Sequence, residues 1–362
     1  MSSPPIRVLL VEDSPVALTI LTRLLSSAPG ITIAGTARNG QEALDLIPQV
    51  NPTIVCTDLH MPKMGGLELT QRIMAECPRP ILVISASVQE NDTDNVFQIL
   101  QAGALDVFPK PLSGLPGEYD QTAKELINRI RILSGVAVFT QHRRTPPHST
   151  PPTPPTPRLS ASLLPTPDIR LPQVVAIGAS TGGPQALYKV LKPLPPNFPA
   201  PIVVVQHISE GFLQGLVDWL DAECALKITI ARPNTLPSPG TVYFAPDGCH
   251  LKLNSQGRFA VQMGSPVSGH CPSITVMFEA IAAYYRRSSI GILLTGMGRD
   301  GAEGLLAISQ SGGTTIAQDE RTCIVFGMPK EAIALNAAEH ILSIERIGPM
   351  LKQIFERSPT SS

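Results

Sequence analysis

Apolar and polar positions alternate along the first third of the chain in blocks that predict strands and helices in turn. Short β-branched apolar runs, which are typical of buried strands, occur at residues 6–11, 31–34, 53–57, 81–84 and 104–108. Between them, apolar residues at helical spacing predict helices over residues 15–25, 40–47, 66–75 and 91–102. This alternation favours an α/β domain with a parallel, doubly wound sheet.

The last half of the chain repeats this type of pattern. Strands are predicted at residues 174–177, 202–205, 227–230 and 290–294, and helices at residues 184–191, 211–222 and 272–285. A hairpin is expected around residues 240–244 and 250–253. We therefore expect a second, mainly parallel α/β domain.

The two patterns are separated by a segment that cannot form a core. After a predicted helix at residues 121–133, the chain from 145 to 172 is crowded with Pro, Thr and Ser, a composition typical of extended linkers. We predict one domain over residues 1–140, a linker over 141–171 and a second domain over 172–362. Docking of the Pro-x-x-Pro pieces to an SH3-like partner is an alternative, but a spacer role accounts for the composition.

Composition narrows the range of partners. The 362 residues carry a formal net charge of −1, which gives no basic footprint for nucleic acid and favours a protein partner. The six cysteines show no CxxC spacing, as expected of reduced thiols. Because the sequence has no signal-peptide pattern and no apolar run of membrane-spanning length, we expect a cytoplasmic protein without membrane insertion. We also expect a monomer.

Polar side chains follow four of the predicted strands in the first domain. They are Glu12 with Asp13, Asp58, Ser85 and Lys110. The carboxyl ends of parallel strands meet at one sheet edge, and three carboxylates converging there suit a hard cation such as Mg²⁺. Asp58 would then be a nucleophile for phosphoryl transfer, with Ser85 and Lys110 binding the phosphoryl oxygens.

At these residues, the segment from 5 to 125 resembles a response-regulator receiver domain, which has a flavodoxin-like fold. The matching motifs are Glu12-Asp13, Thr57-Asp58-Leu59-His60-Met61-Pro62, Ser85 and Lys110-Pro111. The resemblance implies phosphorylation of Asp58 by a histidine kinase. It also implies Mg²⁺ bound by Glu12, Asp13, Asp58 and the main-chain carbonyl of His60. Gly65 departs from the family, which usually has aspartate there.

A glycine-rich turn follows the first strand of the second domain. In Gly178-Ala179-Ser180-Thr181-Gly182, Ser180 lies between a buried strand and a helix, where amides at the helix start face a developing oxyanion. The turn also fits the G-x-S-x-G pattern. Such turns by themselves more often bind phosphate or simply close tightly, and an enzyme with a phosphate-containing ligand would bind nucleotide.

A base and an acid are predicted at the same sheet edge as Ser180. His207 follows the strand at 202–205, and Asp300 follows the strand at 290–294 and a glycine-rich loop. The three residue types fit a nucleophile, a general base and an orienting carboxylate. Taken singly, His207 could be an ordinary edge histidine and Asp300 an N-cap for a helix at 301–306. The order Ser, His, Asp differs from that of the α/β-hydrolases.

With these residues, the segment from 172 to 345 resembles the chemotaxis protein-glutamate methylesterase family, the CheB family. Further matching motifs are Phe244-Ala245-Pro246, Thr295-Gly296-Met297-Gly298-Arg299-Asp300-Gly301 and Gly327-Met328-Pro329. The resemblance implies an oxyanion site from Thr181 and the main-chain amide of Met297. It also implies demethylation of glutamyl methyl esters and deamidation of glutamines on methyl-accepting chemoreceptors, without a cofactor in this domain. Cys271 departs from the family's basic residue.

Two other readings remain beside the enzyme. One is a phosphorylation-dependent, non-catalytic receptor-binding module, against which the complete Ser, His and Asp set speaks. The other is a zinc site at Cys249-His250 and His270-Cys271, which the adjacent ligands and the spacing disfavour.

For regulation, we expect the unphosphorylated receiver to cover the Ser180 cleft and phosphorylation to shift the population toward an open form.

Overall fold

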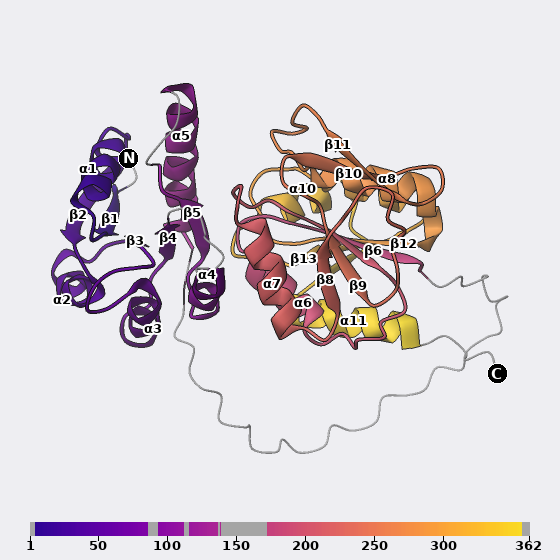
Figure 1. Ribbon diagram of the computed structural model, residues 1–362, viewed down its shortest axis with the longest axis horizontal. Helices are drawn as coiled ribbons and strands as arrows, with labels where there is room; N and C mark the ends of the chain where they lie inside the picture. Colours follow the sequence, from indigo (N-terminus) through magenta and orange to yellow (C-terminus); the bar gives the residue numbers. More distant parts are fainter. Residues whose placement is uncertain (1–3, 86–92, 112–115, 137, 139–171, 357–362) are drawn as a thin grey trace, which may run out of the picture.

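The computed structural model describes residues 4–85, 93–111, 116–136, 138 and 172–356, with side chains described from residue 96 in α4 and from residue 122 in α5. It contains two α/β units that lie side by side (Figure 1). The predicted linker at 141–171 lies outside the described residues, so the domain boundaries there stay a prediction.

The first unit is a five-stranded parallel sheet in the order β2-β1-β3-β4-β5. Its strands are β1 (Ile6–Val11), β2 (Ile31–Ala37), β3 (Ile54–Thr57), β4 (Ile81–Ser85) and β5 (Asp106–Pro109). Its helices are α1 (Pro15–Ser26), α2 (Gly40–Val50), α3 (Gly66–Glu76), α4 (Thr93–Gln101) and α5 (Pro116–Leu133). The predicted doubly wound fold is confirmed, and α5 begins five residues before the predicted helix.

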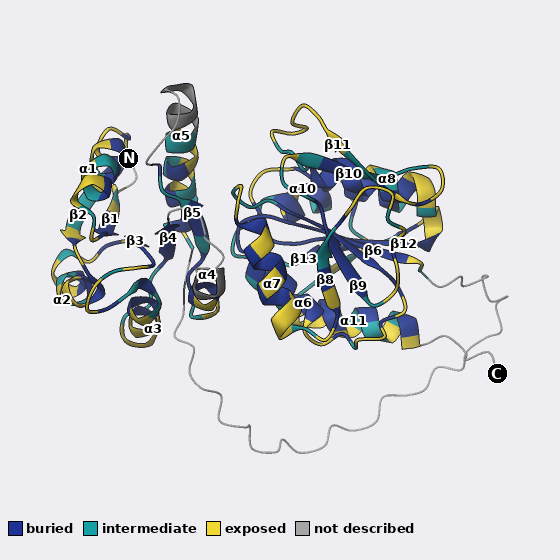
Figure 2. Ribbon diagram, viewed as in Figure 1, coloured by how far each residue is buried: buried dark blue, intermediate teal, exposed yellow. Residues whose placement is uncertain are grey.

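Both faces of this sheet are covered because apolar residues on its central strands are buried on both sides. Along β1, Val8 and Leu10 pack with α1 and α5, whereas Leu9 and Val11 pack with α2, α3 and α4. Residues that alternate along a strand point to opposite faces, so a strand buried on both sides reads as a continuous apolar run. The buried strands and the exposed outer faces of the helices are visible in Figure 2.

The second unit is a seven-stranded parallel sheet in the order β14-β13-β12-β6-β7-β9-β8. Its strands are β6 (Val174–Ala179), β7 (Ile202–Gln206), β8 (Lys227–Ile230), β9 (Thr241–Phe244), β12 (Ser289–Leu293), β13 (Thr314–Gln318) and β14 (His340–Leu342). A separate hairpin joins β10 (Cys249–Leu253) to β11 (Phe259–Met263).

Helices cover both faces of the second sheet as well. One face packs against α6 (Gly183–Leu191), α7 (Leu213–Glu223) and α11 (Ile344–Glu356), and the other against α8 (Ile274–Tyr285), α9 (Ala302–Gln310) and α10 (Met328–Ala334). A short 3-10 turn, Arg286–Ser288, follows α8. None of the described helices has an apolar stretch long enough to cross a bilayer.

The predicted hairpin is wrong in its first strand. Residues 241–244 form β9, which pairs in parallel with β7 and β8 inside the main sheet, and the hairpin partner of β10 is β11. All four residues of β9 are buried, whereas the last two residues of β11 are exposed. A short apolar run does not by itself reveal whether its partner is the next strand or a distant one, because pairing is decided by packing.

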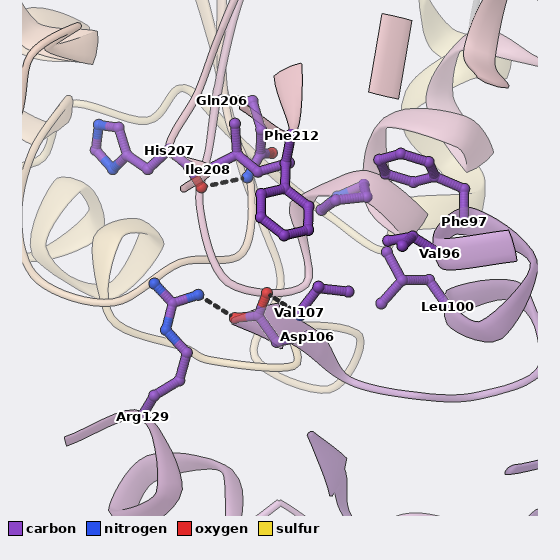
Figure 3. A pocket seen from close by; sticks show the side chains of 11 residues that line it. Val96, Phe97, Leu100, Asp106, Val107, Arg129, Gln206, His207, Ile208 and Phe212 are labelled. Carbon is purple, nitrogen blue, oxygen red and sulfur yellow. Dashed lines mark hydrogen bonds and ion pairs between the residues drawn. The ribbon is translucent and has the colours of Figure 1, made fainter. Parts of the chain in front are cut away.

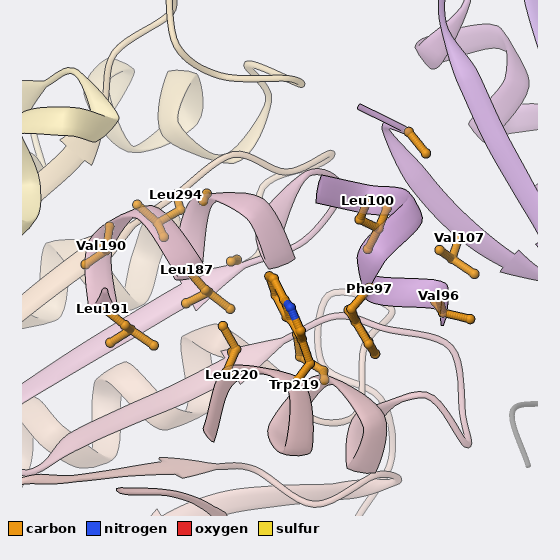
Figure 4. Packing of buried hydrophobic residues seen from close by; sticks show 14 of the residues in the cluster. Val96, Phe97, Leu100, Val107, Leu187, Val190, Leu191, Trp219, Leu220 and Leu294 are labelled. Atoms are coloured by element: carbon orange, nitrogen blue, oxygen red, sulfur yellow. The ribbon is translucent and has the colours of Figure 1, made fainter. Parts of the chain in front are cut away.

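The two units share an apolar contact formed mainly by α4 of the first and α7 of the second. Val96, Phe97 and Leu100 of α4 are buried in the same cluster as Leu187 of α6 and Trp219 of α7, as Figure 4 shows. The core of the second unit therefore continues into the first. Removing apolar area from water stabilises such a contact by about 25 cal/mol per Å².

Candidate active site

Ser180 lies in the turn between β6 and α6, which is held by main-chain contacts and small residues. The Ser180 amide donates to the carbonyl of Thr295 at 3.0 Å. Gly182 has φ +76°, a left-handed conformation that glycine adopts readily. At Gly183, an added Cβ would come within 1.9 Å of Gln206 Oε1. The two glycines therefore let the chain turn sharply beneath the hydroxyl.

His207 directly follows β7, and its Nε2 lies 3.0 Å from Oδ2 of Asp300. The Asp300 carboxylate also accepts hydrogen bonds from Ser273 Oγ at 2.8 Å and from the amides of Ile274 at 2.8 Å and Thr275 at 3.1 Å. Burial by itself would raise the pKa of Asp300. The hydrogen bond and charge of His207, together with the α8 contacts, outweigh burial and lower this pKa below its usual range.

The alternative that Asp300 is the N-cap of the helix that follows it is wrong. The N-cap of α9 is Gly301, and the Asp300 carboxylate lies instead against the first turn of α8. Amides at a helix N-terminus are positively polarised and have no partners inside the helix. They therefore help to keep Asp300 ionised while it faces His207.

The contact with Asp300 fixes the tautomer of His207. An ionised carboxylate only accepts hydrogen bonds, so Nε2 carries the proton and Nδ1 holds the lone pair. Nδ1 is buried and has no hydrogen-bond partner among the described residues. Nδ1 is consequently the atom available to take a proton from a nucleophile.

His270 lies face to face with His207, with ring centroids 3.8 Å apart and planes 2° apart. Its Nδ1 lies 3.0 Å from the carbonyl of Ser268, and burial followed by the nearby His207 lowers its pKa. The lone pair of a ring nitrogen lies in the plane of its ring, and two parallel planes do not meet, so the two rings cannot both direct a lone pair at one ion. The cluster of His207, His270 and Asp300 therefore fits a metal ion poorly, although suitable ligand atoms lie within 4.8 Å of one another.

Ser180 and His207 line the same cavity, which has a volume of about 390 Å³. We call it the catalytic chamber; the catalytic side of its wall includes Ser180, Thr181, His207, His270 and Met297, and the opposite side is one face of α5. No hydrogen bond joins Ser180 Oγ to His207 within the described part of the chain. Such contacts often tighten only when substrate binds.

The predicted oxyanion residues also lie at this chamber. The amides of Thr181 and Met297 donate to no carbonyl of the described residues, so both can bind an oxyanion. The Met297 side chain is 38% exposed, and its Sδ lies 3.7 Å from Asn128 Nδ2 of α5.

The sheet order explains why these residues meet. β6 lies between β7 and β12, and the chain leaves β6 toward β7 and only later reaches β12 on the other side. A place where connections leave neighbouring strands in opposite directions is called a topological switch point, and ligand sites of open parallel sheets form there, beyond the carboxyl ends of the strands. Ser180, His207 and Asp300 follow these three central strands.

Gln206 and the receiver residues near His207 were not predicted. Gln206 Nε2 donates to the carbonyls of Ser180 and His207, both at 2.8 Å, and so links the two turns. Figure 3 shows Asp106 and Arg129 of the receiver, paired at 2.5 Å, across a small cavity from Gln206 and His207. Gln206 ends β7 directly before His207, which is a local signal for its place, whereas the two receiver residues carry no such signal.

The acidic residues of the first unit gather at the edge of its sheet. Ligand atoms of Glu12, Asp13 and Asp58 lie within 4.8 Å of one another, and Glu12 and Asp58 are buried. Lys110 Nζ lies 2.6 Å from Asp58 Oδ2 and 2.9 Å from Glu12 Oε2. The buried Ser85 ends β4, and its carbonyl accepts from the Lys110 amide at 2.8 Å.

Charge in this pocket is only partly balanced. Burial, and then the charge of Asp58, raise the pKa of Glu12 above its usual range. Burial would lower the pKa of Lys110, but its hydrogen bonds with Asp58 and Glu12 raise it. Three carboxylates beside one ammonium fit a divalent cation with oxygen ligands, as predicted for Mg²⁺.

The zinc alternative does not fit the geometry of His250. Its Nε2 lies 3.1 Å from the carbonyl of Ser265, and its Nδ1 accepts from the Ser273 amide at 3.2 Å. Both ring nitrogens are engaged by protein groups, so neither is available to a metal without rearrangement.

Fold and site together define a class: a receiver-like domain joined to a second parallel α/β unit that carries a serine, a histidine and an aspartate at one sheet edge. In agreement, the family model "CheB methylesterase" matches residues 175–351, and "Response regulator receiver domain" matches residues 8–115.

Curated relatives match the chain over nearly its whole length. A "protein-glutamate methylesterase/protein-glutamine glutaminase 1" of Syntrophus aciditrophicus (strain SB) is 40% identical, over 96% of this chain and 98% of that protein. A similarly named protein of Myxococcus xanthus (strain DK1622) is also 40% identical, over 99% of each chain. The chain therefore belongs to the CheB methylesterase family, and it is a hydrolase of that family with its own receiver domain.

Solved structures resemble each unit separately. The CheB methylesterase catalytic domain of Thermotoga maritima is 39% identical, with a TM-score of 0.49, over 50% of this chain and 98% of that chain. The response regulator domain of the same organism's CheB is 29% identical, with a TM-score of 0.33, over 37% of this chain and 98% of that chain.

Proposed function

We propose that this protein removes methyl groups from glutamyl methyl esters on methyl-accepting chemoreceptors, with Ser180 as nucleophile, His207 as base and Asp300 as its orienting acid. The observation that carries this proposal is the 3.0 Å contact between His207 Nε2 and Asp300 Oδ2, beside a chamber that Ser180 also lines. The names of the curated relatives support the substrate class.

In the proposed reaction, Ser180 Oγ attacks the ester carbonyl carbon while Nδ1 of His207 takes the hydroxyl proton. Negative charge on the carbonyl oxygen is stabilised by Thr181 and the Met297 amide. His207 returns the proton to the methoxy group, and methanol leaves. Water, activated by the same nitrogen, then releases the glutamate and the free hydroxyl of Ser180. With a glutamine substrate, ammonia replaces methanol as the leaving group.

Asp58 is the proposed phosphorylation site, with Glu12, Asp13, Asp58 and the His60 carbonyl as ligands of Mg²⁺. These residues would hold the cation, whose positive charge would offset the negative charge of the transferred phosphoryl group. A chemotaxis histidine kinase would supply that group, and Lys110 with Ser85 would hold its oxygens. Lys110 follows β5, which also carries Asp106, the partner of Arg129 on α5. This link offers a physical route from the phosphorylation site to the face of α5 that lines the chamber.

Methanol release from a methylated receptor fragment, with and without a small phosphodonor and Mg²⁺, tests the proposal. We expect phosphodonor to raise the rate in the native protein, Ser180→Ala to lose activity in both conditions, and Asp58→Asn to keep only the basal rate. Methanol release that survives Ser180→Ala would contradict the enzyme mechanism. Binding to the receptor without turnover would favour the non-catalytic module instead.

A further inference from the structure

Helix α5 of the receiver covers the side of the catalytic chamber opposite Ser180 without filling the chamber, and we call this face of α5 the roof. The lining residues Glu125, Asn128, Arg129 and Ile132 are spaced as one face of a helix. They face Ser180 and Thr181 across a volume of about 390 Å³. Contact between the two units thus leaves free space next to the nucleophile.

The chamber has an exposed rim and a buried floor. Glu125 and Asn128 are exposed, and Met297 is 38% exposed, whereas Ser180 is only 6% exposed. Among the described residues lining the chamber, its catalytic side carries no Asp, Glu, Lys or Arg, and Arg129 of the roof is already paired with Asp106. A small uncharged solute in the chamber therefore meets no charged group on the catalytic side and leaves the Arg129–Asp106 pair in place.

Volume decides which substrates fit. A receptor helix with its side chains has a diameter of about 10–12 Å, and four α5 residues already line the side of the chamber that faces Ser180 and Thr181. A cavity of about 150 Å³ already accepts benzene. The docked α5 therefore occupies the place that a helical receptor segment would need beside Ser180, whereas the chamber of about 390 Å³ is large enough for a small ester.

We propose that the unphosphorylated protein, with its receiver docked, hydrolyses small uncharged carboxylic esters in the catalytic chamber. This inference rests on the proposed function of Ser180. Ser180 Oγ bonds to the acyl carbon, the carbon to alkoxy bond breaks, and His207 passes the hydroxyl proton to the leaving alcohol. Water then cleaves the acyl-serine to give the acid and regenerate the hydroxyl. The receiver excludes substrates by size rather than switching the chemistry off.

The test compares two substrates on the full chain with one readout, methanol release. The small probe is N-acetylglutamate α-amide γ-methyl ester, an uncharged copy of the proposed substrate side chain, and the large one is a methylated receptor fragment. On adding phosphodonor and Mg²⁺, we expect kcat/KM for the small ester to change by less than about threefold, and that for the receptor fragment to rise by at least about tenfold.

Variants of the roof give an independent measurement. Asn128→Trp adds bulk at the chamber and is expected to lower small-ester turnover several-fold without phosphodonor, whereas Lys124→Trp, at an exposed neighbouring position that does not line the chamber, is expected to leave it unchanged. Ser180→Ala is expected to stop the hydrolysis of both substrates.

The outcomes separate the two proposals. Equal stimulation of both substrates by phosphodonor, or small-ester hydrolysis that survives Ser180→Ala, would overturn the size-selective roof. A small ester that is not hydrolysed by an unphosphorylated protein whose receptor activity responds to phosphodonor would overturn it too, while leaving the proposed function intact. Loss of both activities even with phosphodonor would instead reject the proposed function on which the roof depends.

Discussion

Phe97 of α4 stacks on Trp219 of α7, with ring centroids 5.3 Å apart and planes 10° apart. The pair joins the two units, and Tyr188 of α6 packs on the same indole at 5.3 Å. Stacked aromatic pairs contribute about 0.5–1.5 kcal/mol beyond the area they bury. A change in the docking of the receiver therefore changes the surroundings of Trp219.

Phe97→Ala is expected to weaken receiver docking because it removes this stack and its buried area. Trp219 is the single tryptophan of the chain and is only 5% exposed, so its emission should shift to longer wavelength as it meets water. Basal methanol release from the receptor fragment should rise toward the phosphorylated level. Val16→Ala, at a 68% exposed position on α1, is the matched control. Unchanged emission and unchanged basal activity would show that this contact does not hold the receiver.

His270→Ala is expected to lower kcat by about tenfold, that is by about 1.4 kcal/mol, with KM little changed. The alanine frees the His207 ring from the parallel partner at 3.8 Å, so His207 spends less time in the orientation that Asp300 requires. His270→Phe retains a flat ring and should recover most of the rate. Equal losses in the two variants would assign His270 a role that depends on its nitrogens rather than on stacking.

Gly183→Ala is expected to lower kcat because its Cβ would lie 1.9 Å from Gln206 Oε1 and push the amide off the Ser180 and His207 carbonyls. The clash predicts non-additivity: Gly183→Ala combined with Gln206→Ala should be no slower than Gln206→Ala alone. Gly135→Ala, whose Cβ would meet its nearest neighbour at an ordinary 3.5 Å, serves as control. Additive losses would show that the glycine acts independently of Gln206.

Asp300→Asn is expected to reduce the free energy of unfolding near neutral pH by about 3–5 kcal/mol, since it removes a buried charge that faces His207 and the start of α8. Because the pKa of Asp300 is lower in the folded protein than in the unfolded chain, ionisation of this carboxyl group stabilises the fold. Its stabilisation is present above the unfolded carboxyl pKa of about 3.9 and is lost as the pH falls from there through the folded pKa. Urea unfolding at several pH values should show the native and variant curves converging in acid. A constant difference down to pH 3 would contradict this account.

The periodicity of the sequence was sufficient for most of the fold. Strands such as Ile6–Val11 and Ile202–Gln206 are apolar at nearly every position, so a parallel sheet covered on both faces could be predicted from local pattern. The positions of Ser180, His207 and Asp300 just after such strands predicted a common edge. Their roles as nucleophile, base and acid stay predictions for the experiments above to test.

Other features were decided only by the tertiary structure. The pairing of β9 with β7, the stacking of His270 on His207, the support of Asp300 by α8 and the docking of Phe97 on Trp219 all join residues that are distant in sequence. Local spacing records which face of an element is apolar, but not which distant element will cover it. That choice depends on the packing of the whole chain, which minimises exposed apolar area and unpaired polar groups together.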